Sequence, residues 1–111
     1  MKKSRVYEKT KRWLRKTYPL PFPCRVLLRP QKAMKAHKAV GIFFWMDDRA
    51  IIWISDTGHQ VHMSECLIEE WVHAMRQATP LGVDYDGETH DAAFWALYGE
   101  VTTKWRNAVL P

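Results

Sequence analysis

Four side chains in this sequence have the types and spacing of a metal-dependent hydrolase site. Glu69, Glu70 and His73 lie within one five-residue stretch, and His90 follows seventeen residues later. On a helix, Glu69 and His73 share a face because residues four apart lie one turn apart, so both can bind one ion. Glu70, rotated by about 100° from Glu69, can take a proton from a metal-bound water. The usual pattern is H-E-x-x-H, so Glu69 stands where a histidine is expected.

The same stretch has a second explanation, the polar face of an ordinary amphipathic helix. An apolar stripe is formed by Leu67, Ile68, Trp71, Val72 and Met75. At about 100° per residue this stripe lies roughly opposite Glu69, Glu70 and His73. Glutamates and a histidine are ordinary residues for such a face, so the five-residue stretch alone leaves both explanations open.

His90 favours the metal site. It is expected at the start of the last helix, in line with Phe94, Leu97 and Val101, the side that packs inward. The positive end of the helix dipole disfavours imidazolium and favours the neutral ring that binds metals. The alternative is a histidine that only begins the helix. Two histidines and one carboxylate suit Zn²⁺ first, and Mn²⁺ or Fe²⁺ as well.

Two segments carry a resemblance to a known family. Residues 67–74 (LIEEWVHA) and 90–95 (HDAAFW) resemble the small zinc metallopeptidases of the SprT-like or minimal gluzincin type. The resemblance covers roughly residues 38–106. It implies a zincin-like fold, a peptide or protein substrate, Glu69, His73 and His90 as metal ligands, and Glu70 as general base. A carboxylate in place of the first histidine adds negative charge at the ion, which weakens its Lewis acidity.

Four further residues are weaker candidates for the site. Tyr85 and Tyr98 can donate a hydrogen bond to an oxyanion, although Tyr98 also suits helix packing. His62 can replace Glu69 as a ligand, or lie in an exposed turn or edge strand. Glu100 can orient a ligand histidine, or be a solvated helix residue. The sequence leaves these alternatives open.

The elements that would position these residues make up an α+β fold. The expected helices are residues 3–17, 64–77 with Ser64 as its cap, and a last helix capped by Thr89 that runs to about Arg106. The expected strands are Cys24–Leu28, Val40–Trp45 and Ala50–Ile54, with a short fourth strand around Gln60–Met63, and residues 30–37 and 79–88 read as loops. This order predicts a small antiparallel sheet of about three strands with helices packed on it.

The length and charge of the chain bound its organisation. A chain of 111 residues, 47% of them hydrophobic, is expected to form one domain. We divide it into a basic N-terminal helix (1–17), a sheet (24–63) and a helical part with the site (64–107). No stretch reads as a signal peptide or a membrane span, and Cys24 and Cys66 do not form a C-x-x-C pair, so we expect a cytoplasmic protein.

The net charge of +5 is concentrated at the N-terminus. Residues 1–17 contain eight lysines and arginines against Glu8 alone, and the remaining chain is slightly acidic. Such a segment can contact nucleic acid or an acidic protein, or can be a solvated helix face. The second function class is therefore a non-catalytic zincin-like or basic binding module.

Overall fold

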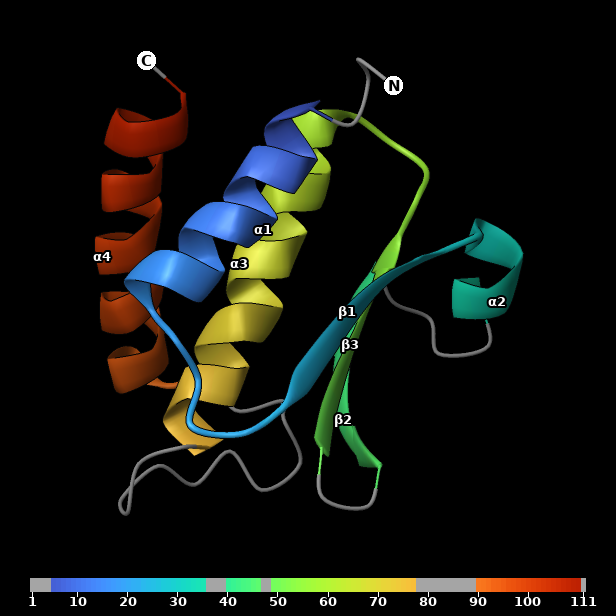
Figure 1. Ribbon diagram of the computed structural model, residues 1–111, viewed down its shortest axis with the longest axis horizontal. Coiled ribbons are helices and arrows are strands. Elements are labelled where there is room, and N and C mark those ends of the chain that lie inside the picture. Colours follow the sequence, from blue (N-terminus) through green and yellow to red (C-terminus); the bar gives the residue numbers. More distant parts are fainter. Residues whose placement is uncertain (1–4, 36–39, 47–48, 78–89, 111) are drawn as a thin grey trace.

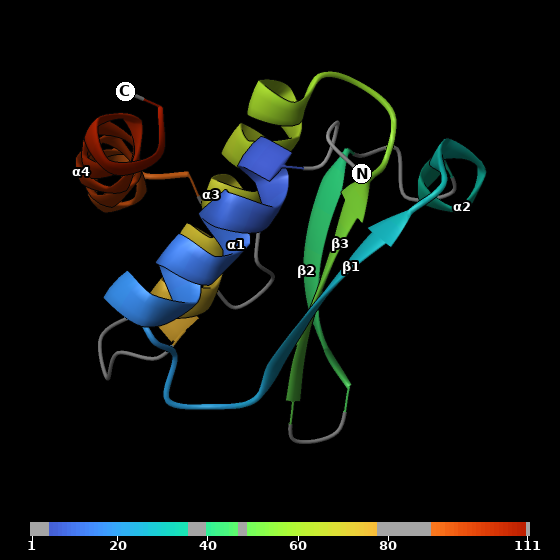
Figure 2. The same ribbon diagram turned by 45° about the horizontal axis from the view of Figure 1, so that its top comes forward.

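The computed structural model describes residues 5–35, 40–46, 49–77 and 90–110, and these form an α+β fold, as predicted. The elements in order are α1 (Arg5–Thr17), β1 (Cys24–Arg29), α2 (Gln31–Lys35), β2 (Gly41–Met46), β3 (Arg49–Ser55), α3 (Gln60–Gln77) and α4 (Ala92–Val109). Helices α1, α3 and α4 lie together on one side of the sheet, and the short α2 lies beyond the end of β1 (Figures 1 and 2). Among the described residues, no helix is long and apolar enough to cross a membrane.

The sheet is mixed, and the prediction of a purely antiparallel sheet was wrong. Its strand order is β1-β3-β2, with β1 parallel and β2 antiparallel to β3. The hairpin of β2 and β3 was predicted correctly. The central place of β3 follows from its composition, because Ile51 and Ile52 are buried on opposite faces of the sheet. A strand that is apolar on both faces is best placed between two others.

Helix α3 begins earlier than predicted. It starts at Gln60, so the fourth strand around Gln60–Met63 does not form and Ser64 is not the cap. The amide of Met63 donates to the His59 carbonyl at 2.9 Å, which closes the first turn. Ser64 is instead fully buried inside the helix, where its hydroxyl lies 3.1 Å from the Thr10 hydroxyl. A tertiary contact therefore holds a residue whose type suggested a helix end.

Two other boundaries also differ from prediction. The expected loop at 30–37 contains α2, in which the amides of Ala33 and Met34 donate to the Pro30 carbonyl. Met34 is fully buried, so packing stabilises this short helix. The cap of α4 is Asp91 rather than Thr89, which lies outside the described residues, and α4 continues to Val109.

A buried threonine joins the three long helices. The Oγ1 atom of Thr10 in α1 accepts a hydrogen bond from Trp105 Nε1 of α4 at 2.8 Å and lies next to Ser64 of α3. Tyr7 and Leu14 are buried on the same face of α1. These contacts fix α1 and α4 against α3, the helix that also packs on the sheet. The helix with Glu69 and His73 is thus packed between the sheet and the two other long helices.

Candidate metal centre

Glu69, His73 and His90 converge where the end of α3 meets the start of α4. His73 Nε2 and His90 Nε2 are 3.0 Å apart, and His90 Nε2 lies 3.4 Å from Glu69 Oε2. One donor atom from each residue lies within 4.8 Å of the other two. His73 is buried, whereas Glu69 and His90 are partly open to solvent. The group is therefore anchored inside the protein and accessible from outside.

The two separations at His90 fit a single divalent cation. Donors placed 2.0–2.1 Å from a tetrahedral zinc ion are roughly 3.3 Å from one another, and the two separations at His90 are 3.0 and 3.4 Å. One carboxylate and two neutral imidazoles also supply the nitrogen and oxygen donors that such ions prefer. The three side chains brought together are those that the sequence indicated, so the arrangement can hold a metal ion.

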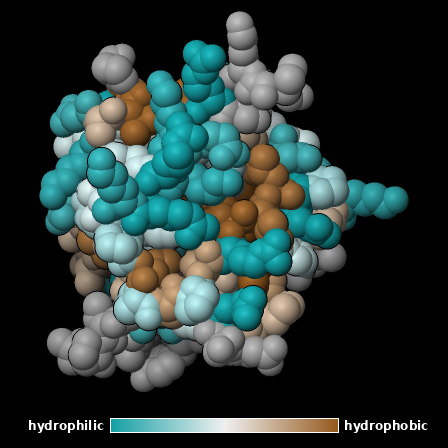
Figure 3. Space-filling model, in the orientation of Figure 1, coloured by the Kyte–Doolittle hydropathy of each residue, from teal (hydrophilic) through white to brown (hydrophobic). Residues whose placement is uncertain are grey.

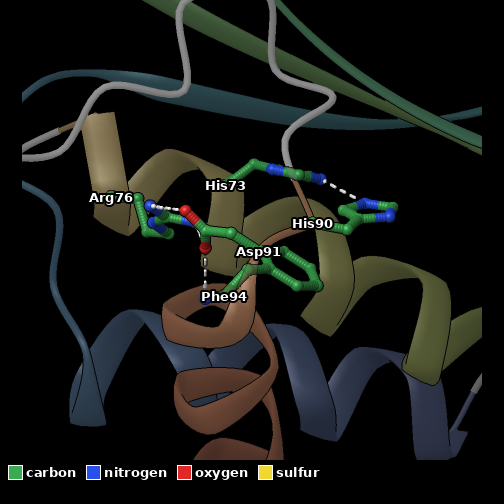
Figure 4. A network of polar contacts seen from close by, with 5 residues as sticks. All are labelled: His73, Arg76, His90, Asp91 and Phe94. Carbon is green, nitrogen blue, oxygen red and sulfur yellow. Dashed lines mark hydrogen bonds and ion pairs between the residues drawn. The ribbon is translucent and has the colours of Figure 1, made fainter.

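Phe94 fixes the planes of the two histidine rings. It is fully buried, and its ring is stacked on His73 at 4.6 Å and on His90 at 4.5 Å between centroids. The two imidazoles are themselves stacked at 5.0 Å with an interplanar angle of 21°. Figure 4 shows the two rings and Phe94 side by side at the start of α4. The donors are thus oriented by packing before any ligand binds.

An ion pair that the sequence analysis did not assign holds the two helices together at this point. Arg76 donates to both carboxylate oxygens of Asp91, at 2.8 and 3.2 Å, in a bidentate geometry (Figure 4). The same carboxylate accepts a hydrogen bond from the Phe94 amide at 2.9 Å and so caps α4. The hydrogen bond from Arg76, and then that from the Phe94 amide, lower the pKa of Asp91. The signal in the sequence was an aspartate directly before a helix.

Glu70 is not one of the three side chains that converge, and it faces the start of β2. Its side chain is largely buried, and it packs under the first residue of β2. A Cβ atom at Gly41 would lie 3.2 Å from Glu70 Cγ and 3.3 Å from Glu70 Oε2. The absence of a side chain at Gly41 therefore lets this carboxylate approach the edge of the sheet.

The weaker candidates that the structure describes are not part of the group formed by Glu69, His73 and His90. Tyr98 of α4 is half-buried and stacks on Phe94 at 6.0 Å; burial, with Glu65 and Glu69 nearby, raises its pKa to about 12. His62 is exposed on the first turn of α3, with Nε2 3.7 Å from Cys66 Sγ. Glu100 is exposed on α4, where it pairs with Lys104 at 3.5 Å. Tyr85 lies outside the described residues.

No protein-family model, curated protein or solved structure matches this chain. The resemblance to SprT-like metallopeptidases therefore stays a prediction from two short segments. What the fold adds is the geometry of the three donors.

Proposed function

We propose that this protein is a metal-dependent hydrolase of peptide bonds, with Glu69, His73 and His90 as the metal ligands. The observation that carries the proposal is the convergence of these side chains, with separations of 3.0 and 3.4 Å at His90. Three protein ligands that leave a fourth position open are the composition of catalytic rather than structural zinc sites. Zn²⁺ is the expected ion, and Mn²⁺ and Fe²⁺ suit the same donors.

Separate residues of the chain would have separate roles in such a reaction. The ion, when bound, would polarise the substrate carbonyl as a Lewis acid. Glu70 follows Glu69 directly and would accept a proton from the attacking water. His73 and His90 would bind the ion through neutral imidazole nitrogens, because protonated imidazole has no free donor electron pair. A peptide substrate is supported by β2, an edge strand that begins beside Glu70 and can pair with an extended backbone.

The test separates metal binding from hydrolysis. Protein purified without chelators is analysed for metals, and its action on denatured casein is followed by release of labelled peptides. Glu70→Gln is expected to keep the metal and to lose hydrolysis, whereas His90→Ala is expected to lose both. Glu65→Gln on the same helix is the matched control and should change neither.

Two results would contradict the proposal. Protein that contains no metal and takes up neither Zn²⁺, Mn²⁺ nor Fe²⁺ would remove the metal centre. Protein that binds a metal but cleaves casein no faster than the Glu70→Gln variant would leave a binding site without peptidase activity.

A further inference from the structure

One face of α1 carries four exposed cations in a row. Arg5, Lys9, Arg12 and Lys16, here called the basic stripe, are all exposed. At about 100° per residue, they fall within a sector of about 60° around the helix axis. They span about 16 Å of helix at 1.5 Å per residue. Hydrophilic side chains cover the surface over α1 in the space-filling view (Figure 3).

Among the described residues, no ion pair uses the charges of the basic stripe. Lys11 pairs with Glu8 at 3.3 Å, and Arg15 donates to the Cys24 carbonyl at 3.0 Å and lies over the Trp71 ring. No residue of the basic stripe pairs with a carboxylate of the described residues. Like charges four apart, as at Arg5 and Lys9, also destabilise a helix. Four uncompensated cations are therefore a cost to the fold that a bound anion would remove.

The helix presents these charges on a fixed support. Its opposite face is buried through Tyr7, Thr10 and Leu14. The amide of Val6, in its first turn, donates to Gln60 Oε1 of α3 at 2.7 Å. The spacing of the cations is thus set before a partner arrives, which lowers the entropy cost of binding.

The buried face also decides which polyanion fits. A helix that inserts into a lipid surface needs an exposed apolar face, and the apolar face of α1 is buried in the core. A single nucleic-acid strand is usually held by exposed aromatic rings. Helix α1 has two aromatic residues: Tyr7 is buried, and Trp13 packs edge-on against Tyr18 with 5.7 Å between ring centroids. Neither ring is therefore offered to a base. A surface of cations alone suits the backbone of a duplex.

We propose that the basic stripe binds the phosphate backbone of double-stranded nucleic acid, independently of base sequence. A duplex strand carries a phosphate about every 3.4 Å along its axis, so about 16 Å of helix faces several phosphates. Four phosphate contacts predict a slope of about −3.6 in a plot of log affinity against log salt concentration. The basic stripe shares no residue with the group of Glu69, His73 and His90, so duplex binding and metal binding can be tested separately.

The test compares two pairs of substitutions that remove equal charge. Binding to a fluorescein-labelled 20-base-pair duplex is measured by anisotropy between 50 and 200 mM NaCl. Lys9→Gln with Arg12→Gln removes two cations of the stripe and is expected to weaken binding and to reduce the slope by about two. The matched control, Arg25→Gln with Lys32→Gln, removes one arginine and one lysine that are exposed on β1 and α2. This control should keep most of the affinity for the duplex and should leave the slope of log affinity against log salt concentration unchanged.

Several outcomes would overturn the proposal. Absence of duplex binding at 50 mM NaCl would do so directly. Equal losses of duplex affinity in the two double variants would show that net charge, rather than the basic stripe, attracts the duplex. Binding to phosphatidylserine vesicles without binding to the duplex would assign the stripe to a membrane surface. Circular dichroism of both variants checks that each is folded.

Discussion

In the proposed site, Glu69 would determine how strongly a bound ion acts on a substrate. Its carboxylate lies 3.4 Å from His90 Nε2, and it supplies a negative charge where the H-E-x-x-H pattern has a neutral histidine. A neutral ligand leaves more positive charge on the ion. Glu69→His is therefore expected to raise the hydrolysis rate by about tenfold, or about 1.4 kcal/mol in activation free energy, and to shift the rise of rate with pH to lower pH. Rates on casein across a pH series measure both.

The control for this substitution is Glu65→His, one turn earlier on α3. It adds the same side chain at a position that is not one of the three proposed ligands, and it should leave the rate unchanged. If Glu69→His binds metal but is slower than the natural protein, the carboxylate is required for activity, and the argument from charge is wrong.

Gly41 is the residue at which the sheet and the site meet. A methyl group there would lie 3.2 Å from Glu70 Cγ and 3.3 Å from Ile54 Cδ1. Gly41→Ala is expected to displace Glu70, to slow hydrolysis and to lower the free energy of unfolding by about 1–3 kcal/mol, while the metal content stays the same. Urea unfolding and metal analysis test this.

Gly99 provides the matched comparison. It lies inside α4, and a Cβ atom there would meet no atom within 4 Å. Gly99→Ala should therefore stabilise the protein by about 0.5–1 kcal/mol through helix propensity. A loss of stability at both glycines would show that contact with Glu70 is not the reason for the effect at Gly41.

At the scale of elements, the pairing of Arg76 with Asp91 fixes α4 against α3. The carboxylate both caps α4 and accepts two hydrogen bonds from Arg76, so it sets the position of the neighbouring His90. Asp91→Asn is expected to weaken metal binding by about 10–100-fold, as is usual for groups that orient ligands. Competition with a chromophoric chelator measures the affinity. Glu100→Gln, which breaks the exposed pair with Lys104, should leave it unchanged.

The same pair predicts a dependence of stability on pH. The pKa of Asp91 is lowered in the folded protein, chiefly by the hydrogen bond from Arg76. Its contribution is therefore complete above the pKa of an unfolded aspartate and is lost as the pH falls through the lowered folded value. Thermal unfolding from neutral to acid pH should show a smaller loss of stability in Asp91→Asn than in the natural protein. An equal loss of thermal stability on acidification in both proteins would contradict the role of this carboxylate.

The sequence predicted which helices and strands form better than it predicted where they end and which strands pair. Apolar runs were enough to find the β2–β3 hairpin, and the pattern of Glu69, His73 and His90 was enough to predict three side chains that converge. The position of β1 beside β3 was not predictable, because parallel pairing depends on contacts distant in sequence. The start of α3 was missed because Ser64 resembles a cap, while its hydroxyl bonds to Thr10 instead. The role of Arg76 was missed because only the folded chain places it beside Asp91.

At the scale of the whole molecule, Thr10 is a buried polar residue of α1 that contacts both α3 and α4. Thr10→Val keeps the shape of the side chain but leaves the buried Trp105 Nε1 without an acceptor. An unsatisfied buried donor costs about 1–3 kcal/mol, and we expect the free energy of unfolding to fall by that amount. Urea unfolding tests this, with Thr103→Val on the exposed side of α4 as the control. A loss no larger than that of the control would contradict the role of Thr10.

The hydrogen bond from Trp105 to Thr10 joins residues 95 positions apart in the chain. We expect contacts over such distances to form late, because the entropy cost of closing a long loop must be overcome first. The packing of α4 onto α1 and α3 that makes this bond also brings His90 to Glu69 and His73. Metal uptake would then mark the last step of folding. In a refolding experiment, capture of the ion should coincide with the final change in tryptophan fluorescence, and partly folded chains should not retain it.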